Sequence, residues 1–199
     1  MECAGFKPNS NVYNKILDAY AKRANNSFCK KSEILLDKME KIGSADRVSY
    51  NIVFNAHAKL KPSRGKSGIE SDFWKSIESR LAIMEDSTIS NVKPDVDTYN
   101  AAISTLVNNS GGRENAEMAE RIMTRMFDHY QKGNVSVKPT TVTMNIVLNV
   151  WATSREDDAA QKTEKIIENM KALLIEPDTI SYTTVRTLIM HYFVSTFCF

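Results

Sequence analysis

Cysteine is scarce in this chain: Cys3, Cys29 and Cys198 are the three cysteines among 199 residues. Three is an odd number, and none of these residues forms a C-x-x-C spacing. A disulfide scaffold and a structural zinc site are therefore not expected. We interpret the three as reduced, buried or incidental thiols.

Neither sign of charge predominates, because 26 Lys and Arg residues face 24 Asp and Glu residues, for a net charge of +2. This balance neither indicates nor excludes nucleic-acid binding, which depends on where the charges lie. The apolar stretch 188–199 is too short to span a bilayer as a helix, so no membrane association is expected. The N-terminus shows no signal or transit peptide. Both ends resemble cuts through a repeat, which indicates a fragment.

The sequence also lacks a recognisable catalytic or metal-binding set. His57, His129 and His191 have no ligand spacing and accompany no nucleophile–His–acid arrangement, and His57 is expected to be packed in the core. Residues 65–67 read Gly-Lys-Ser like the end of a phosphate-binding loop, but Leu60 stands where the upstream Gly belongs. We therefore expect no enzyme activity, no cofactor and no metal.

Acidic residues gather at two places, Asp157-Asp158 and Glu114 to Glu120. Negative charge is favourable near helix N-termini. We interpret both groups as solvated charge at helix starts.

What the sequence does contain is a recurring pair, an aromatic or Met residue followed by Asn. Intervals of 37, 49, 45 and 38 residues separate the successive copies, the fifth of which has Thr in place of Asn: Tyr13-Asn14, Tyr50-Asn51, Tyr99-Asn100, Met144-Asn145 and Tyr182-Thr183. A short segment ending in a small polar residue precedes them: Pro8-Asn9, Ala45-Asp46, Pro94-Asp95, Pro139-Thr140 and Pro177-Asp178. Recurrence at such intervals indicates an array of repeats.

Each copy opens a segment with the apolar spacing i, i+3, i+4, i+7, which predicts an amphipathic helix. The four stripes are Tyr13, Ile16, Leu17 and Tyr20; Tyr50, Val53, Phe54 and His57; Tyr99, Ala102, Ile103 and Leu106; and Met144, Val147, Leu148 and Trp151. The Tyr residues share the phase of these stripes, so we expect them in the core.

A polar break and a second helix follow each stripe. The apolar residues expected on the second helices are Ile34, Leu35 and Met39; Ile77, Leu81 and Met84; Met118, Ile122, Met123 and Met126; and Ile166, Ile167, Met170 and Leu173. Gly43 and Gly133 stand where a left-handed residue ends a helix. The predicted fold is therefore all-α, an α-solenoid of stacked helix-turn-helix repeats forming a right-handed superhelix.

The repeat starts divide the chain into a series of units. We expect the tail of a preceding repeat at 1–9, repeat one at 10–46, repeat two at 47–95, repeat three at 96–140, repeat four at 141–178 and a truncated fifth repeat at 179–199. Extra residues at 61–68 and around 131–137 lengthen repeats two and three within loops, where added length is tolerated.

These features resemble the pentatricopeptide repeat family over nearly the whole chain. The copies that carry the resemblance best are residues 96–100, Val-Asp-Thr-Tyr-Asn, and residues 176–183, with Met170 ahead of Pro177-Asp178. Long repeats, Ala45 in place of Pro and Met144 in place of Tyr are typical of a degenerate, insertion-bearing member. The tetratricopeptide repeat family, which binds peptides, is a poorer fit because its Trp, Gly and Tyr pattern is missing.

The resemblance implies single-stranded RNA binding with one base read per repeat. In the family, the Asn after Tyr reads the base together with the last residue of the same repeat. The implied pairs are Asn14 with Asp46, Asn51 with Asp95, Asn100 with Thr140 and Asn145 with Asp178, while Thr183 lacks its partner. Since Asn with Asp favours uracil in the family, three of four repeats would prefer U, a pyrimidine bias.

Further family positions imply contacts to base faces and to phosphates. Val48, Val142 and Ile180 would pack on bases, whereas Asn11 and Asp97 do not suit that role. Asp97 would place a negative charge near the RNA strand, so repeat three should bind weakly or not at all. Lys22, Arg23, Lys59 and Lys61 would contact phosphates at the far ends of the first helices. Asn108 and Thr153 stand at that place in repeats three and four, so the salt dependence of binding should be shallow.

Alternatives remain open. Each Asn after Tyr can alternatively be interpreted as a helix cap. The Pro-Asp joints can alternatively be interpreted as residues that only separate one helix from the next, as helix punctuation. A second hypothesis is a protein-binding scaffold whose groove accepts a peptide or helix and does not read RNA. A third is that this fragment alone binds nothing tightly. The main hypothesis is a monomer that binds an organelle transcript in RNA processing or stability, with protein partners possible. By resemblance, its location is a mitochondrion or plastid.

Overall fold

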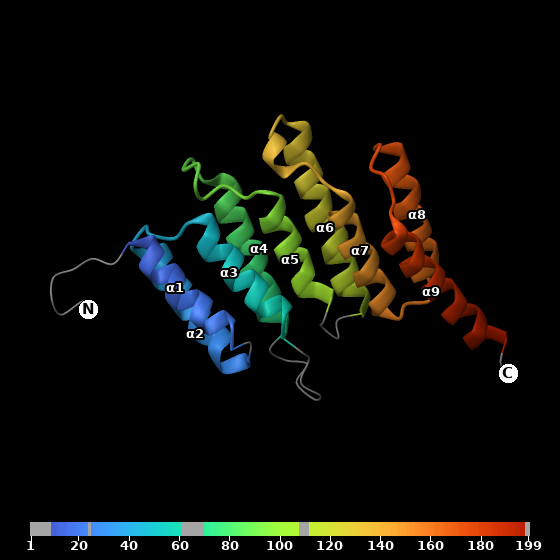
Figure 1. The fold of residues 1–199 in the computed structure, drawn as a ribbon, viewed down its shortest axis with the longest axis horizontal. Helices are drawn as coiled ribbons and strands as arrows, with labels where there is room; N and C mark the ends of the chain where they lie inside the picture. Colours follow the sequence, from blue (N-terminus) through green and yellow to red (C-terminus); the bar gives the residue numbers. More distant parts are fainter. Residues whose placement is uncertain (1–8, 24, 61–69, 108–111, 198–199) are drawn as a thin grey trace. The chain divides into compact units, whose positions relative to one another are not determined.

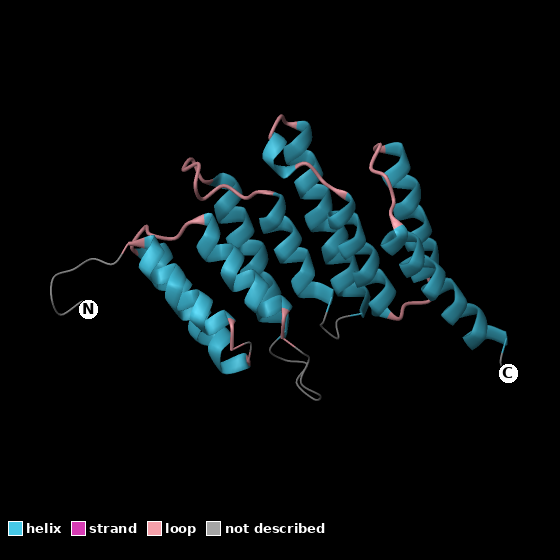
Figure 2. Cartoon of the chain, viewed as in Figure 1, coloured by secondary structure: helices cyan, strands magenta, loops and turns pink. Residues whose placement is uncertain are grey.

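The computed structural model describes residues 9–23, 25–60, 70–107 and 112–197, without the side chains of 70–74 and 191–197. The regular structure in these ranges is helical, and Figure 2 shows no strand among them. The elements are α1 (Ser10–Ala21), α2 (Asn26–Lys41), α3 (Arg47–Ala58), α4 (Glu70–Asp86), α5 (Val96–Val107), α6 (Gly112–Gln131), the short 3-10 helix η2 (Val135–Val137), α7 (Thr141–Ser154), α8 (Ala159–Ala172) and α9 (Thr179–Phe197). The all-α prediction is confirmed.

The chain divides into two compact units, 1–108 and 109–199. In the first unit α1 packs against both α2 and α3, and α3 packs along α5 (Figure 1). One apolar core joins its helices, and its most deeply buried members include Leu17, Leu36, Met39, Tyr50, Val53, Phe54, Ile77, Met84 and Ala102. Helical hairpins thus bury their stripes against neighbouring hairpins.

In the second unit α7 is the central helix, since it packs against α6, α8 and α9 (Figure 1). Its stripe of Met144, Val147, Leu148 and Trp151 is buried. The right-handed superhelical turn is a property of the whole array and stays a prediction.

The polar residue ahead of each first helix caps that helix. The side chains of Asn9, Asp46, Asp95, Thr140 and Asp178 each accept the backbone N–H of the residue three positions on. Such caps satisfy one of the free amides at a helix start. The interpretation of the Pro-Asp joints as punctuation is therefore confirmed, whereas the interpretation of the Asn after Tyr as a cap is wrong.

Left-handed residues end several helices, as predicted for Gly43 and Gly133, whose φ values are +68° and +97°. Arg155 and Leu174 adopt the same conformation without being Gly, at φ +61° and +55°. A non-Gly residue tolerates this region at a modest steric cost.

Most predicted core positions are buried, and the exceptions follow from helix phase. Ile34 is 68% exposed because the buried face of α2 runs through Cys29, Ser32, Leu36 and Met39. Residues two apart lie on opposite sides of a helix, so Leu36 occupies the core in place of Ile34.

Two other apolar predictions, Ile16 and Leu173, are also corrected. Ile16 is 38% exposed at the edge of its stripe, and Leu173 is 38% exposed because it lies beyond the end of α8. Tyr13, Tyr50 and Tyr99 are buried, which confirms the core prediction for these three.

Tyr182 is wrong as a core residue. It is 50% exposed although Ser181 and Val185 on the same helix are buried, because within the described residues α9 packs against α7 and α8 and the side that bears Tyr182 is uncovered. His57, by contrast, is packed as predicted, with its Nε2 3.1 Å from Oε1 of Glu33.

Candidate nucleic-acid interface

The five residues predicted to read bases occupy one register. Asn14, Asn51, Asn100 and Asn145 are each the fifth residue of their helix, on α1, α3, α5 and α7, and Thr183 is the fifth residue of α9. The four Asn side chains are half-buried, and Thr183 is exposed. Equal register on equivalent helices places each predicted reader one turn inside the start of its own helix.

In repeat one the two predicted readers are hydrogen-bonded to each other. Nδ2 of Asn14 donates to Oδ1 and Oδ2 of Asp46, at 3.1 and 3.3 Å. The hydroxyl of Ser49 donates to Oδ1 of Asn14 at 2.7 Å, and the Ser49 backbone N–H donates to Asp46. Asp46 therefore caps α3 and orients Asn14 at once.

Repeat four contains the same network with different residues. Nδ2 of Asn145 donates to Oδ1 and Oδ2 of Asp178, at 3.0 and 3.2 Å. The Ser181 hydroxyl donates to Oδ1 of Asn145 at 2.5 Å. The backbone N–H of Ser181, followed by the Asn145 amide, holds the pKa of Asp178 below its usual range. The carboxylate is therefore ionised and acts purely as an acceptor at neutral pH.

Repeat two is built differently, although it contains the same residue types. Thr98 donates its backbone N–H and its hydroxyl to Oδ1 of Asp95, both at 2.9 Å. Nε of Arg47 lies 3.3 Å from Oδ2 of Asp95. Oδ1 of Asn51 is buried without a hydrogen-bond partner. The Asn–Asp bond of repeats one and four is thus replaced by an ion pair.

The third predicted pair stays a prediction, because Asn100 belongs to the first unit and Thr140 to the second. Thr140 caps α7 through the backbone N–H of Thr143, at 3.5 Å. It has no carboxylate, so it cannot reproduce the acceptor of Asp46 or Asp178.

The three residues predicted to pack on bases are exposed. Val48, Val142 and Ile180 are 54%, 59% and 62% exposed, each as the second residue of its helix. Single exposed aliphatic residues are ordinary on a protein surface, but three at the same register form a pattern. Asn11 and Asp97 occupy the same register on α1 and α5 and are also exposed. This exposed register therefore carries apolar residues on α3, α7 and α9 and polar residues on α1 and α5.

The predicted phosphate contacts lie at the C-terminal ends of α1 and α3. Lys22, Arg23 and Lys59 are all exposed, and Lys61 falls outside the described residues. Lys22 forms an ion pair with Asp18 at 2.7 Å, and the Arg23 guanidinium lies 5.0 Å from the ring centre of Phe28. Exposed ion pairs exchange partners cheaply, so Lys22 can still meet a phosphate.

An open groove of about 930 Å³ lies in the second unit. Its lining includes Asn149 and Thr153 from the last turns of α7, Thr183 and Thr187 from α9, and Arg155 from the turn that follows α7. No cation was expected in this repeat, because Thr153 stands at the position predicted to contact phosphate. Arg155, two residues after Thr153, supplies a cation there. A basic residue within the polar break is the sequence signal that could have identified it.

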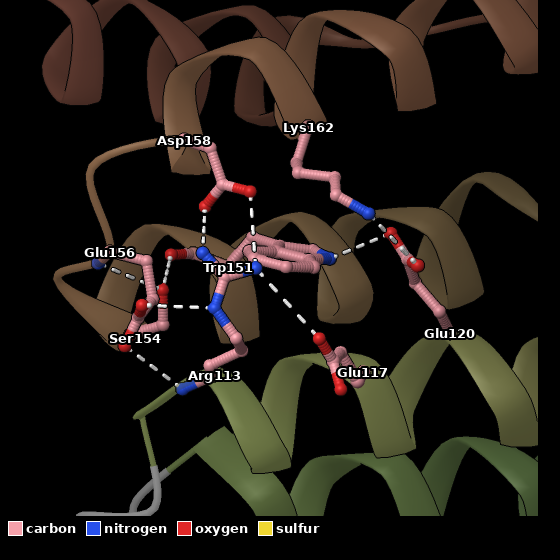
Figure 3. Close-up of polar contacts among 8 residues, drawn as sticks. All are labelled: Arg113, Glu117, Glu120, Trp151, Ser154, Glu156, Asp158 and Lys162. Atoms are coloured by element: carbon pink, nitrogen blue, oxygen red, sulfur yellow. Dashed lines mark hydrogen bonds and ion pairs between the residues drawn. The ribbon is translucent and has the colours of Figure 1, made fainter.

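Figure 3 shows the polar network that fixes this turn. The Arg113 guanidinium on α6 contacts Asp158 at 2.7 Å and Glu156 at 3.2 Å. The hydrogen bond from Arg113 is the largest cause of the lowered pKa of Asp158. Asp158 occupies the N-cap position of α8, the helix start expected for it, but its side chain makes no cap hydrogen bond to α8. The α7–α8 turn is instead tied to the start of α6.

Glu120 also departs from expectation. Its Oε1 accepts the indole N–H of Trp151 at 3.0 Å, and Lys162 lies over the Trp151 ring and 3.7 Å from Oε2 (Figure 3). Glu120 therefore satisfies a buried indole rather than standing in solvent.

Comparisons with known proteins agree with the helical-repeat architecture. Residues 82–154 match the family model of the pentatricopeptide repeat domain. A pentatricopeptide repeat-containing protein of Arabidopsis thaliana is 24% identical over 154 residues, which cover 77% of this chain and 23% of that protein. The chain thus spans less than a quarter of the length of this relative. Within the described residues, none of the helices is long and apolar enough to cross a membrane.

Proposed function

Since this chain belongs to the pentatricopeptide repeat family, we propose that it binds single-stranded RNA without cleaving it, as part of the processing or stabilisation of an organelle transcript. The bases are read at the fifth residues of α1, α3, α5 and α7. The chain acts as a monomer, and its resemblance to the family supports a mitochondrion or plastid as its location.

The observation that carries the proposal is the repeated Asn–Asp pair. Asn14 with Asp46 and Asn145 with Asp178 have nearly the same geometry, although they lie in different units. A helix cap alone needs the Asp and not the Asn. The Asn keeps a second amide hydrogen and a further lone pair, so it can pair with the Watson–Crick edge of a base while the Asp holds it in place.

This chemistry favours uracil at repeats one and four. A uracil edge offers an N–H donor between two carbonyl acceptors, which match the oxygen and the nitrogen of an Asn side chain. Val48, Val142 and Ile180 stand exposed near the readers and cover the base face with apolar surface.

Few cations are placed to neutralise phosphates. Lys22, Arg23, Lys59 and Arg155 are exposed at the ends of first helices. Four such contacts on a single strand give a log–log salt slope of about −3, since each contributes about −0.7. Binding should therefore decline gradually with salt, and base contacts should carry much of the discrimination.

Titration of the chain with U-rich and A-rich single-stranded RNA at low and moderate salt tests the proposal. We expect U-rich RNA to bind at least about fivefold more tightly, since one base-edge hydrogen bond is worth about 1 kcal/mol. The substitutions Asn14→Ala and Asn145→Ala should reduce this preference.

Asn169→Ala is the matched control, because Asn169 is exposed on the second helix α8. It should leave the preference unchanged. A chain that shows no U preference, or whose preference survives both reader substitutions, contradicts base reading. Capture of a protein partner that persists after nuclease treatment would favour the scaffold alternative instead.

A further inference from the structure

The residue one helical turn before each reading Asn differs between repeats. It is Ser10 before Asn14, Arg47 before Asn51 and Thr141 before Asn145. Ser10 Oγ donates to the backbone oxygen of Ser44 at 2.7 Å, and Thr141 Oγ1 donates to that of Glu176 at 2.9 Å. In both cases the accepting residue lies two positions before the Asp. A short hydroxyl therefore ties down the loop and leaves the carboxylate to the Asn.

Arg47 does not act in this way, because its side chain reaches the carboxylate itself. Nε of Arg47 lies 3.3 Å from Oδ2 of Asp95, and both side chains are partly buried, at 33% and 26% exposed. Residues four apart on a helix lie on the same face, so Arg47 and Asn51 face the same acceptor. Oδ1 of Asn51 is also buried without a partner. The hydroxyl of Thr98 donates to Asp95, whereas the hydroxyls of Ser49 and Ser181 also donate to the Asn of their repeat.

We propose that Arg47 is a specificity-determining residue that withdraws Asp95 from Asn51 and so relaxes base selection at repeat two. This inference rests on the proposed RNA-binding function. A contact between ions is stronger than a contact between a neutral amide and an ion, and partial burial strengthens it further. Arg47 therefore outcompetes the Asn51 amide for Asp95.

The consequence for RNA concerns orientation. In repeats one and four the Asp holds the amide nitrogen and thereby fixes which end of the Asn faces the base. Without that bond the Asn51 amide can present either its donor or its acceptor. Repeat two should then accept bases that repeats one and four reject, despite its matching Asn and Asp.

Arg47→Thr is the decisive variant, because it installs the residue type of Thr141 at the same place. A U-run oligonucleotide carrying one A at successive positions measures discrimination along the strand. For the wild-type chain, affinity should fall when the A lies at either of two positions, those read by repeats one and four. For the variant, affinity should also fall, by about fivefold, when the A lies at a third position, the one read by repeat two, because one hydrogen bond is restored.

A second readout needs no RNA. The side-chain amide signals of Asn14 and Asn145 should shift in NMR spectra as acid protonates the carboxylates to which they are bonded. The amide signal of Asn51 should not shift when Asp95 is protonated. In Arg47→Thr the Asn51 amide signal should shift with the protonation of Asp95. Arg121→Thr removes an exposed cation from α6 and should change neither readout.

The outcomes separate the two proposals. If the wild-type chain binds no RNA, the proposed function fails, while the amide signals still test the Arg47 arrangement. An Asn51 signal that already follows Asp95 in the wild type overturns the inference. So does an Arg47→Thr chain with the same two sensitive positions as the wild type.

Discussion

Asn145 and Asp178 are 33 positions apart in the chain, yet Nδ2 of Asn145 donates to both carboxylate oxygens at 3.0 and 3.2 Å. Asp178 also caps α9 through the Ser181 backbone N–H at 2.9 Å. One carboxylate thus starts a helix and orients a side chain of the helix before it. Because the same carboxylate serves both tasks, the capping of α9 and the orientation of Asn145 are linked at this joint.

The substitution Asn145→Ala should raise the pKa of Asp178 towards its ordinary value of about 3.9, because it removes one donor to the carboxylate. A carboxyl group whose folded-state pKa is depressed stabilises the fold above its unfolded pKa. That stability is lost as pH falls through the folded-state pKa. The variant should therefore lose less stability on acidification than the wild type does at this site.

Carbon NMR of the Asp178 carboxyl across the acid range measures this shift directly. Asn169→Ala serves as the control, since Asn169 lies on α8 away from the Ser181 and Asn145 contacts. An unchanged Asp178 titration in Asn145→Ala would show that the hydrogen bond does not persist in solution.

The phase of α2 can be tested with two substitutions two residues apart. Leu36→Ala should destabilise the first unit by about 2–5 kcal/mol, because Leu36 is fully buried and its loss opens a cavity. Ile34→Ala should change stability by at most about 0.5 kcal/mol, because Ile34 is 68% exposed. Urea denaturation followed by circular dichroism compares the two. A larger loss of stability in Ile34→Ala than in Leu36→Ala would support the helix phase expected from the sequence and contradict the observed one.

Trp151→Phe should destabilise the second unit by about 1–3 kcal/mol, since it removes an N–H donor to an ionised carboxylate and part of a buried ring. The lost contact is the 3.0 Å bond to Glu120. Thermal and urea denaturation give the change in stability. Lys162→Ala is the comparison, because it removes the cation over the ring while keeping the bond, and it should cost less than about 1 kcal/mol. Equal losses in the two variants would mean that the indole bond contributes little.

Cys29 should resist alkylation in the folded chain. Burial, followed by the nearby charge of Glu33, raises the pKa of its thiol to about 11. At pH 8 the reactive thiolate is then roughly a thousandth of the total, against about a quarter at an ordinary pKa near 8.5. Labelling with iodoacetamide, followed by peptide mapping at Cys29, should be more than about a hundredfold slower without urea than with it.

The same shift has a consequence for stability at high pH. A thiol whose folded-state pKa is raised stabilises the fold below its unfolded pKa, and this contribution declines as pH rises from about 8.5 towards 11. Cys29→Ala should therefore flatten the alkaline side of the stability profile. Rapid labelling of Cys29 in the folded chain would contradict its buried position.

Much of the fold was predictable because its signals are local and repeated. A stripe spaced i, i+3, i+4, i+7 needs no distant information, and its fourfold repetition makes the phase hard to mistake. The caps at Asp46, Asp95, Thr140 and Asp178 were predictable for the same reason. The error of phase fell on the second helix α2, where the adjacent apolar residues Ile34, Leu35 and Leu36 allow more than one phase. Tyr182 was mispredicted for another reason, because its burial depends on a packed neighbour that periodicity does not reveal.

The candidate site was predictable in its residue types but not in its bonding. Asn14, Asn51 and Asn145 have equivalent sequence contexts, each with an Asp at the end of its repeat. Two of them bond to that Asp and one does not. Likewise Arg155 enters the groove through a left-handed turn that the sequence pattern does not specify.

The sequence by itself therefore determined the helices, their pairing into hairpins and the register of the readers, because these depend on periodicity within short segments. Tertiary structure decided which reader meets which carboxylate. That choice depends on competition through space, in which the Arg47 cation reaches Asp95 while the shorter Ser10 and Thr141 bind loop carbonyls and leave Asp46 and Asp178 to Asn. Such a competition is settled by side-chain reach and charge once the chain has folded.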